Sequence, residues 1–343
     1  MHYDPFCRGP HPVGVRTVEL EDTARGRTLP VEVWYPADIA HAGEDLGKAT
    51  RDTYVMIPGF PMAWQQARRD AAPAASSSGH FPLALFSHGF AGHRRQSTFL
   101  CTHLASHGWI VAATDHGGNT FKDLALAGAK AGAETWKASM AARPEEIRLL
   151  IDAAGDGRLG VATDTARVAM TGHSFGGWTS LRVIAGEPRI AAVAALAPAV
   201  AVPQLRDALD VRWKRNVPVL VIAAERDSLL PLEGIEAVHR DLPPPATLVV
   251  LTATDHMHFC DGARQIHEIF RAMPVAPVAL ARPLPPFDEL APARAGHEST
   301  MGLVLAHLEA GILDRAPAAE FMAGDLSATL GARGISARSG VHS

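Results

Sequence analysis

The stretch Gly-His-Ser-Phe-Gly-Gly at residues 172–177 decides the fold that this sequence predicts. It follows an apolar run, Ala166–Met170, and precedes a helix-forming segment, Trp178–Ile184. In a G-x-S-x-G motif a sharp strand-to-helix turn exposes the serine hydroxyl above the sheet, and the glycines leave room for that turn. A glycine-rich turn without chemistry would fit the same letters, but the strand and helix around it favour a nucleophilic Ser174.

Short apolar runs alternate with amphipathic segments over most of the chain. This alternation is typical of the α/β class, in which helices cover both faces of a mostly parallel central sheet, and we expect about eight strands. In such sheets the functional side chains gather at the carboxyl ends of the strands. The central runs are Pro82–Phe86, Trp109–Ala113, Ala166–Met170, Ile190–Leu196, Val217–Ala223 and Thr247–Leu251.

Other segments surround these runs. Two valine-bearing stretches, Val13–Leu20 and Leu29–Trp34, predict a hairpin at the edge of the sheet. A proline suited to the first turn predicts a helix over Pro144–Ala154. Residues 36–80 and 117–143 lie between strands and are candidates for a flexible excursion or a partial lid.

The whole chain, residues 1–343, is expected to be a single domain. Its core should cover about residues 10–312 and end with a helix over Gly302–Gly311. Residues 313–343 would then form a C-terminal extension, and we expect its last residues to be disordered.

The acid that supports a catalytic histidine is expected after the run Val217–Ala223, where Glu225 and Asp227 lie. A carboxylate at a strand end can hold an imidazole in the correct tautomer and stabilise its charged form. Asp227 is the candidate because it lies deeper in the turn, and Glu225 is the alternative. A solvated surface pair would also explain both residues.

The general base is expected after the last central run, Thr247–Leu251, which is followed by His256 and His258. The chain has 17 histidines, so the position of a histidine carries more weight than its presence. His256 is the candidate, since nucleophile, acid and base then occur in the order Ser174, Asp227, His256. His258 is the alternative. A metal bound by both histidines would require the two rings to face one way, and we expect no metal.

Acyl transfer also needs two preorganised N–H donors for the oxygen that becomes negatively charged. Phe175, the residue after the nucleophile, would supply one backbone N–H, and Phe90, after the strand end at Ser87–Gly89, would supply the other. Candidates for the apolar walls of a substrate pocket, which ordinary core packing would explain equally well, are Phe90, Phe175, Trp178, Met257 and Phe259.

Composition and charge argue against several classes of partner. The formal net charge of −4 offers no basic surplus for binding nucleic acid or an anionic membrane. The longest apolar stretch, Ile190–Val202, is too short for stable membrane insertion. The first residues lack the basic and apolar regions of a signal peptide, so we expect a cytoplasmic protein, or a secreted one whose leader has been removed.

The sequence gives no sign of a bound nucleotide. It has no G-x-x-x-x-G-K-[ST] pattern, and its G-x-G-x-x-G letters at Gly155–Gly160 follow a predicted helix instead of a strand, so we expect no cofactor. Its cysteines, Cys7, Cys101 and Cys260, have no CxxC spacing. The small odd number favours a reducing compartment, although the sequence leaves a bridge between Cys7 and Cys260 open.

Several of these stretches together resemble one superfamily. The acid strand Val217–Asp227 is similar to that of cutinase-like bacterial polyester hydrolases. The spacing from His256 to Asp261 resembles the surroundings of the catalytic histidine in platelet-activating-factor acetylhydrolases. The resemblance implies the α/β-hydrolase fold and its catalytic machinery. The stretches that resemble the platelet-activating-factor acetylhydrolase and dienelactone-hydrolase-like group are Phe86–Phe90, Leu104–Val111, Asp115–His116 and Gly172–Gly177.

The sequence departs from these families at particular positions. The animal acetylhydrolases carry their acid after the strand that here ends in Ala195–Ala199, which has no carboxylate, so the resemblance moves that role to Asp227. Polyester hydrolases have an aromatic clamp just after the same strand, where this chain has Ala199 and Val200. Dienelactone hydrolases use a cysteine nucleophile in place of Ser174.

Three functions fit these residues. The first is a hydrolase of carboxylic esters with short to medium acyl chains, including acetyl-phospholipid-like or lipid esters, that forms an acyl-enzyme on Ser174. The second is a peptidase or amidase on the same fold, and the third is a binding module without catalysis. The complete triad argues against the third, whereas the first two share it. The expected partner is therefore a small-molecule ester.

Overall fold

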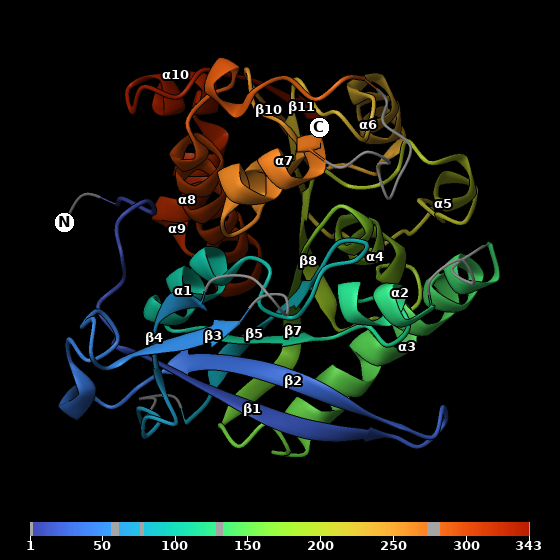
Figure 1. Ribbon diagram of the computed structural model, residues 1–343. Coiled ribbons are helices and arrows are strands. Elements are labelled where there is room, and N and C mark those ends of the chain that lie inside the picture. Colours follow the sequence, from blue (N-terminus) through green and yellow to red (C-terminus); the bar gives the residue numbers. More distant parts are fainter. Residues whose placement is uncertain (1–2, 56–61, 76–78, 128–132, 273–281, 343) are drawn as a thin grey trace. The chain divides into compact units, whose positions relative to one another are not determined.

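The computed structural model of the chain describes residues 3–55, 62–75, 79–127, 133–272 and 282–342 (Figure 1). The chain divides into two compact units. Arg8–Met170 forms the N-terminal unit, and Met1–Cys7 together with Thr171–Ser343 forms the C-terminal unit. Strand β7 (Thr163–His173) continues from the first unit into the second. The single domain expected from the sequence stays a prediction.

The N-terminal unit contains a mixed sheet whose strands follow the order β5-β6-β2-β1-β4-β3. Strands β5 and β6 are parallel, whereas β2 is antiparallel to both of its neighbours, β6 and β1. The strands are β1 (Val13–Asp22), β2 (Arg27–Pro36), β3 (Arg51–Val55), β4 (Met62–Arg69), β5 (Phe81–Ser87) and β6 (Ile110–Thr114). The helices are η1 (Ile39–His41), α1 (Thr98–Ser106), α2 (Phe121–Ala127) and α3 (Ala133–Gly155).

The predicted N-terminal hairpin is present, because β1 and β2 pair along their whole length. Its expected place at the sheet edge is wrong, since β4 adds to β1 and β3 adds to β4. Residues 36–80 therefore contribute two strands. Their alternation is hidden in the sequence because a buried position of β4 holds a polar residue, Gln65. Its amide accepts a hydrogen bond from Trp34 Nε1 (2.6 Å) and donates one to Asp52 Oδ2 (2.6 Å).

Helix α3 begins at Ala133, so the prediction that a helix starts at Pro144 is wrong. Proline disfavours the helical conformation of the residue before it, which here is Arg143. The side chain of Arg143 is fully buried, and its guanidinium donates to the carbonyls of His88 and Gly89. These tertiary contacts hold the helix together across Pro144. The lid role of residues 117–143 and 36–80 stays a prediction, and residues 56–61, 76–78 and 128–132 of them lie outside the described residues.

The C-terminal unit contains three parallel strands that match predicted runs, namely β8 (Ile190–Leu196), β9 (Val219–Ala224) and β10 (Ala246–Leu251). Helix α8 (Ala293–Leu313) packs against β8, and α6 (Leu232–Asp241) packs against β9 and β10 on the opposite side of these strands (Figure 1). The remaining helices are α4 (Phe175–Val183), α5 (Pro203–Asp207), η3 (His256–Phe259), α7 (Ala263–Ala272), η4 (Phe287–Glu289), α9 (Ala316–Ala323) and α10 (Leu326–Gly331).

Residues 337–342 form a strand, which corrects the disorder expected for this part of the chain. Strand β11 (Ala337–His342) pairs antiparallel with all of β10. Its sequence carries few apolar residues, but backbone pairing with a buried strand satisfies its hydrogen bonds without them. Buried Ile335 anchors the segment that leads into it. The described residues thus form eleven strands against about eight predicted, and the additional ones are β3, β4 and β11.

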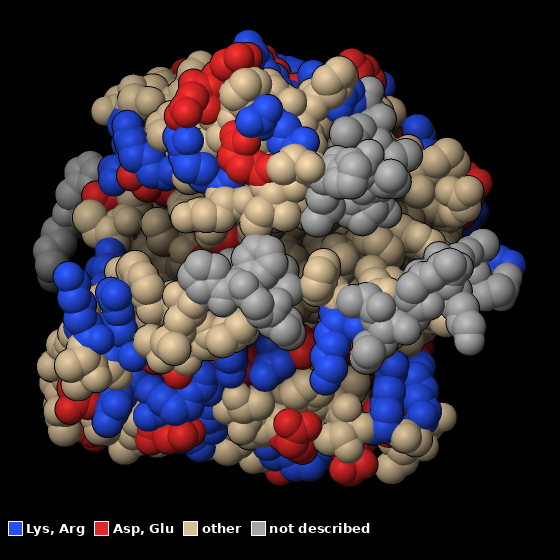
Figure 2. All heavy atoms as spheres, in the orientation of Figure 1, with Lys and Arg blue, Asp and Glu red and all other residues tan. Residues whose placement is uncertain are grey.

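The surface mixes both signs of charge. Figure 2 shows Lys and Arg side chains next to Asp and Glu side chains over the face in view. None of the helices built from described residues combines the length and the hydropathy that a bilayer crossing requires. Within the same residues Cys7 is exposed, Cys260 is buried, and no disulfide joins them.

Candidate active site

Ser174 occupies the turn between β7 and α4 in a strained backbone conformation. Its φ of 58° and ψ of −116° lie in a region that residues other than glycine rarely adopt. The turn is held at the end of β8, because the Ser174 N–H donates to Leu196 O (2.9 Å) and the Ser174 carbonyl accepts from Ala199 N (2.9 Å). The side chain remains 9% exposed. The predicted strand–turn–helix setting of the motif is present.

Gly177 allows this turn to sit close to the sheet. A Cβ at this position would lie 2.9 Å from Pro198 Cα and 3.1 Å from Leu196 O, both of which belong to the backbone. A larger residue would therefore push the first turn of α4 away from the end of β8. The glycine contributes close approach, as the motif requires.

His256 and Asp227 form a buried hydrogen-bonded pair. His256 Nδ1 donates to Asp227 Oδ2 at 2.7 Å, and the two side chains are 2% and 0% exposed. The second oxygen of Asp227 accepts the backbone N–H groups of Leu229 (2.9 Å) and Leu230 (2.8 Å). This arrangement fixes the tautomer of His256 and leaves its Nε2 as the atom that can accept a proton.

The negative charge of Asp227 makes the His256 imidazole more basic. Burial works to lower the pKa of His256, but the charge and hydrogen bond of Asp227, together with the charge of Asp255, outweigh it and raise that pKa above its ordinary value. An imidazole with such a partner can take up a proton during a reaction and hold it.

The alternative acid and base have other partners. Glu225 Oε2 accepts the Ala253 N–H (2.9 Å), so its carboxylate ties the acid turn to the base turn. His258 Nδ1 accepts the Asp255 N–H (3.0 Å), and its Nε2 donates to Ala291 O (2.8 Å). Both ring nitrogens of His258 are hydrogen-bonded to the protein, so they are not placed to bind a metal ion together with His256. Among the described residues no group of three or more His, Cys, Asp and Glu side chains is placed to hold a metal ion.

Comparisons with known proteins agree with this architecture. Residues 81–215 match the family described as "Serine aminopeptidase, S33". A ferulic acid esterase from Streptomyces cinnamoneus has a similar solved structure, with a TM-score of 0.63 at 24% identity, covering 89% of this chain and 91% of that one.

The chain has the α/β-hydrolase fold. Three curated relatives align with part of the chain. It is 26% identical over 182 residues to "Cutinase est1" of Thermobifida alba and 29% identical over 219 residues to "Putative esterase NocK" of Nocardia uniformis. It is 24% identical over 190 residues to a bis(hydroxyethyl) terephthalate hydrolase of Streptomyces coelicolor. The alignments cover 50%, 60% and 54% of this chain and 52%, 58% and 53% of the three relatives.

His173 is a member of the site that sequence reasoning missed. Its ring lies against the ring of His256, with 4.5 Å between centroids, and its Nε2 donates to the His256 carbonyl (3.1 Å). Burial, and then the charge of His256, keep the pKa of His173 well below its ordinary value, so the ring stays neutral. The signal was its place directly before Ser174, which puts it at the same strand end. It brings the chain neighbour of the nucleophile into contact with the base.

The predicted oxyanion donor Phe90 follows a tightly held turn of the N-terminal unit. The Gly89 carbonyl accepts hydrogen bonds from His88 Nδ1 (2.7 Å) and from Arg143 (3.3 Å), which also donates to the His88 carbonyl (2.7 Å). In a trans peptide the carbonyl of one residue and the N–H of the next point to opposite sides. The Phe90 N–H is therefore directed away from Arg143. The half-buried Phe90 ring stacks on Trp136 at 4.5 Å between centroids.

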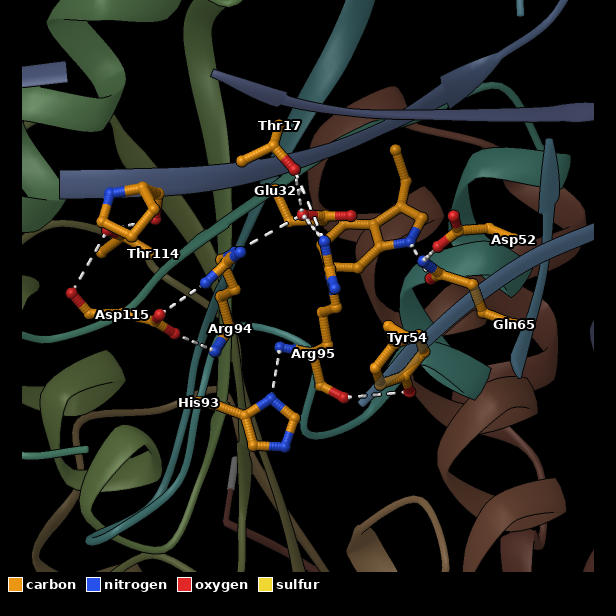
Figure 3. Close-up of polar contacts among 12 residues, drawn as sticks. Thr17, Glu32, Asp52, Tyr54, Gln65, His93, Arg94, Arg95, Thr114 and Asp115 are labelled. Carbon is orange, nitrogen blue, oxygen red and sulfur yellow. Dashed lines mark hydrogen bonds and ion pairs between the residues drawn. The ribbon is translucent and has the colours of Figure 1, made fainter. Parts of the chain in front are cut away.

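Ion pairs anchor the loop after this turn (Figure 3). Buried Glu32 of β2 accepts hydrogen bonds from Arg94 (3.4 Å), Arg95 (3.0 Å) and Arg69 (2.7 Å). Arg94 also donates to Asp115 at the end of β6, through its backbone N–H (2.7 Å) and its guanidinium (2.5 Å). The loop is thus fixed to two strands of its own unit. Sequence reasoning missed this cluster because its members come from distant stretches.

The predicted pocket residues of the C-terminal unit are buried: Phe175, Trp178, Met257 and Phe259. Trp178 also donates from its ring N–H to the Leu205 carbonyl (2.6 Å), as a core tryptophan does. Core packing, the alternative reading of these residues, accounts for this burial, and their contact with substrate stays a prediction.

Proposed function

We propose that this α/β-hydrolase cleaves carboxylic esters through an acyl-enzyme on Ser174. The observation that carries the proposal is the 2.7 Å bond between His256 Nδ1 and Asp227 Oδ2, in the same unit as a serine held at positive φ. Curated relatives named as a cutinase, an esterase and a terephthalate-ester hydrolase support an ester as the bond that is broken.

The reaction uses the three side chains in sequence. His256 Nε2 takes the hydroxyl proton of Ser174 as its Oγ attacks the ester carbonyl, and Asp227 stabilises the imidazolium that forms. The backbone N–H of Phe175, with the N-terminus of α4 behind it, stabilises the tetrahedral oxyanion, and the role of Phe90 as the second donor stays a prediction from the sequence. His256 then protonates the leaving alcohol. Water, deprotonated by the same imidazole, releases the acid and restores Ser174.

The proposed substrates are small esters with short to medium acyl chains, a class that includes acetyl-phospholipid-like esters. Ala199 and Val200, after β8, are small and buried. In the polyester hydrolases that this sequence resembles, an aromatic clamp follows the same strand. A chain without that clamp is poorly suited to large aromatic polymers. On the face shown in Figure 2, Lys and Arg side chains alternate with Asp and Glu side chains, so this face offers no extended field of one sign for a polyanionic substrate.

Amide hydrolysis is the second candidate, and the match of residues 81–215 to a serine aminopeptidase family favours it. Both reactions use the same triad, so the leaving group must decide between them. The test is kcat/KM for p-nitrophenyl esters of increasing acyl length and for the p-nitroanilide of the best acyl group. We expect the ester to be preferred by orders of magnitude and the rate to fall for long acyl groups. A preference for the anilide would replace the ester proposal with the amide one.

A further inference from the structure

Asp255, the residue before the base, joins the acid turn to the base turn. Its side chain is fully buried. One oxygen, Oδ2, accepts both the backbone N–H (2.9 Å) and the hydroxyl (2.5 Å) of Ser228, which directly follows Asp227. A single carboxylate next to His256 thus holds the residue next to Asp227. The two neighbours of the Asp227–His256 pair are bonded to each other.

The other oxygen of Asp255 faces a second histidine. His267, on α7, places its Nδ1 3.2 Å from Asp255 Oδ1 and its Nε2 2.8 Å from the Pro285 carbonyl. Carboxylates and carbonyls accept hydrogen bonds and do not donate them, so both ring nitrogens of His267 act as donors. A ring with two donors is the imidazolium form. Asp255 and His267 therefore form a buried ion pair beside the catalytic pair.

We propose that Asp255, paired with His267, is a positioning residue that locks the turns carrying Asp227 and His256 to each other. The effect of Asp255 on catalysis rests on the proposed function. The spacing of the acid and the base is then set by a second buried carboxylate, Asp255, in addition to the direct bond between Asp227 and His256. Glu225 bonds the same two turns through the Ala253 N–H, but it does so without contacting either neighbour of the catalytic pair.

The charge of Asp255 also acts on His256. The pKa of Asp255 is held below its ordinary value, since hydrogen bonds from His267 and Ser228 outweigh the effect of burial, so the group is a carboxylate. The titratable groups around His256 are Asp227 on the acid turn, His173 on β7, and Asp255 with His267 behind it on α7. His297 of α8, the other helix against η3, bonds the Cys260 carbonyl (2.9 Å).

Asp255→Asn tests the proposal with little change of shape. The amide oxygen can still accept from Ser228, but the amide nitrogen must then donate to His267 Nδ1, which makes His267 neutral. We expect kcat to fall about tenfold or more, with KM changed less than about threefold, because the substrate is not touched. The pKa of His256 should fall, because the charge of Asp255 acts on its ring directly, whereas the charge that His267 loses lies behind Asp255.

The pKa of His256 is measured by NMR titration of its ring proton, assigned by loss of the signal in His256→Gln. This readout does not depend on hydrolysis. If the wild type cleaves no ester, the proposed function fails, whereas the titration still decides the role of Asp255. An Asp255→Asn protein with unchanged kcat and an unchanged His256 titration would overturn the inference.

Two further variants control the result. Glu225→Gln keeps an acceptor for Ala253 but removes a charge from the same turns. That charge is not among those that raise the pKa of His256, so we expect the His256 titration to stay in place. His267→Asn keeps a donor to Asp255 but removes the positive charge, so the pKa of His256 should rise. This second variant tests the pairing even if Asp255→Asn does not fold. Shifts of the same sign in Asp255→Asn and His267→Asn would contradict the proposed ion pair.

Discussion

The N-terminal unit contains a serine, a histidine and a carboxylate joined by hydrogen bonds, and the C-terminal unit contains Ser174 and a hydrogen-bonded histidine–carboxylate pair; only the second set is suited to catalysis. In the N-terminal unit, His116 Nδ1 donates to Glu146 (2.5 Å) and its Nε2 lies 2.7 Å from the Ser87 hydroxyl. The proton arrangement is the one expected of a triad. In the C-terminal unit the corresponding carboxylate–histidine bond joins Asp227 and His256.

Backbone strain, access and neighbouring charge separate the two sets. Ser87 is the last residue of a regular strand and is completely buried, whereas Ser174 has a positive φ and remains 9% exposed. Burial, followed by the positive charges of Arg143 and Arg27, holds the pKa of His116 well below its ordinary value, whereas the pKa of His256 is raised. Hydrogen-bond geometry alone therefore does not identify a catalytic triad.

The largest expected effect is a contrast between the two serines. Ser174→Ala should lower kcat by about 10⁴-fold or more, because no other group replaces the nucleophile. Ser87→Ala should leave kcat within about tenfold, and destabilise the fold by about 1–3 kcal/mol, because it leaves buried partners unsatisfied. Steady-state rates and chemical denaturation of both variants measure the contrast. A Ser87→Ala enzyme as inactive as Ser174→Ala would reverse the assignment.

The two histidines after β10 should differ almost as strongly. His256→Ala removes the base and should lower kcat by several orders of magnitude. His258→Ala removes hydrogen bonds to Asp255 and Ala291 and should mainly reduce stability, with a much smaller loss of kcat. Rates of both variants with the same ester test this. If His258→Ala is the more damaging change, the base has been assigned to the wrong ring.

The pH dependence of hydrolysis should follow His256. The imidazole must be neutral to take the proton of Ser174, and its pKa is raised from the ordinary value of 6.5. We therefore expect kcat/KM to fall as pH drops through a value above 6.5, whereas an unperturbed histidine would become protonated only near pH 6.5. A pH profile that stays flat down to pH 5 would exclude His256 as the general base.

Stability in acid should follow His116, and this is the smallest expected effect. Its folded pKa is lowered, so below about pH 6.5 the unfolded chain binds a proton that the folded chain does not. The free energy of unfolding should then fall with decreasing pH by up to about 1.4 kcal/mol per unit for this group. In His116→Gln the slope between pH 6.5 and pH 5 should be shallower, as urea denaturation would measure. An unchanged slope would mean that His116 titrates normally.

The parts of the site that follow apolar runs could be predicted from the sequence. Ser174 comes directly after a strand, and Asp227 and His256 lie in the turns that follow β9 and β10; their order along the chain distinguishes them from similar residues nearby. The central strands β8, β9 and β10 were found for the same reason, since buried parallel strands are continuous apolar runs.

The supporting residues could not be predicted, because their partners are defined only by the fold. Arg143 and Glu146 lie within α3 in a stretch whose charges are typical of an exposed helix face, yet both are buried. Asp255 was passed over for the histidine beside it. Strands β4 and β11 were missed because backbone pairing, with few buried apolar side chains, holds them in place.

Labelling with a fluorophosphonate, followed by peptide mapping, tests most directly that the C-terminal set is the reactive one. We predict one modified residue, Ser174, with labelling lost in Ser174→Ala and retained in Ser87→Ala. A label on Ser87, or wild-type protein that remains unmodified, would contradict the account.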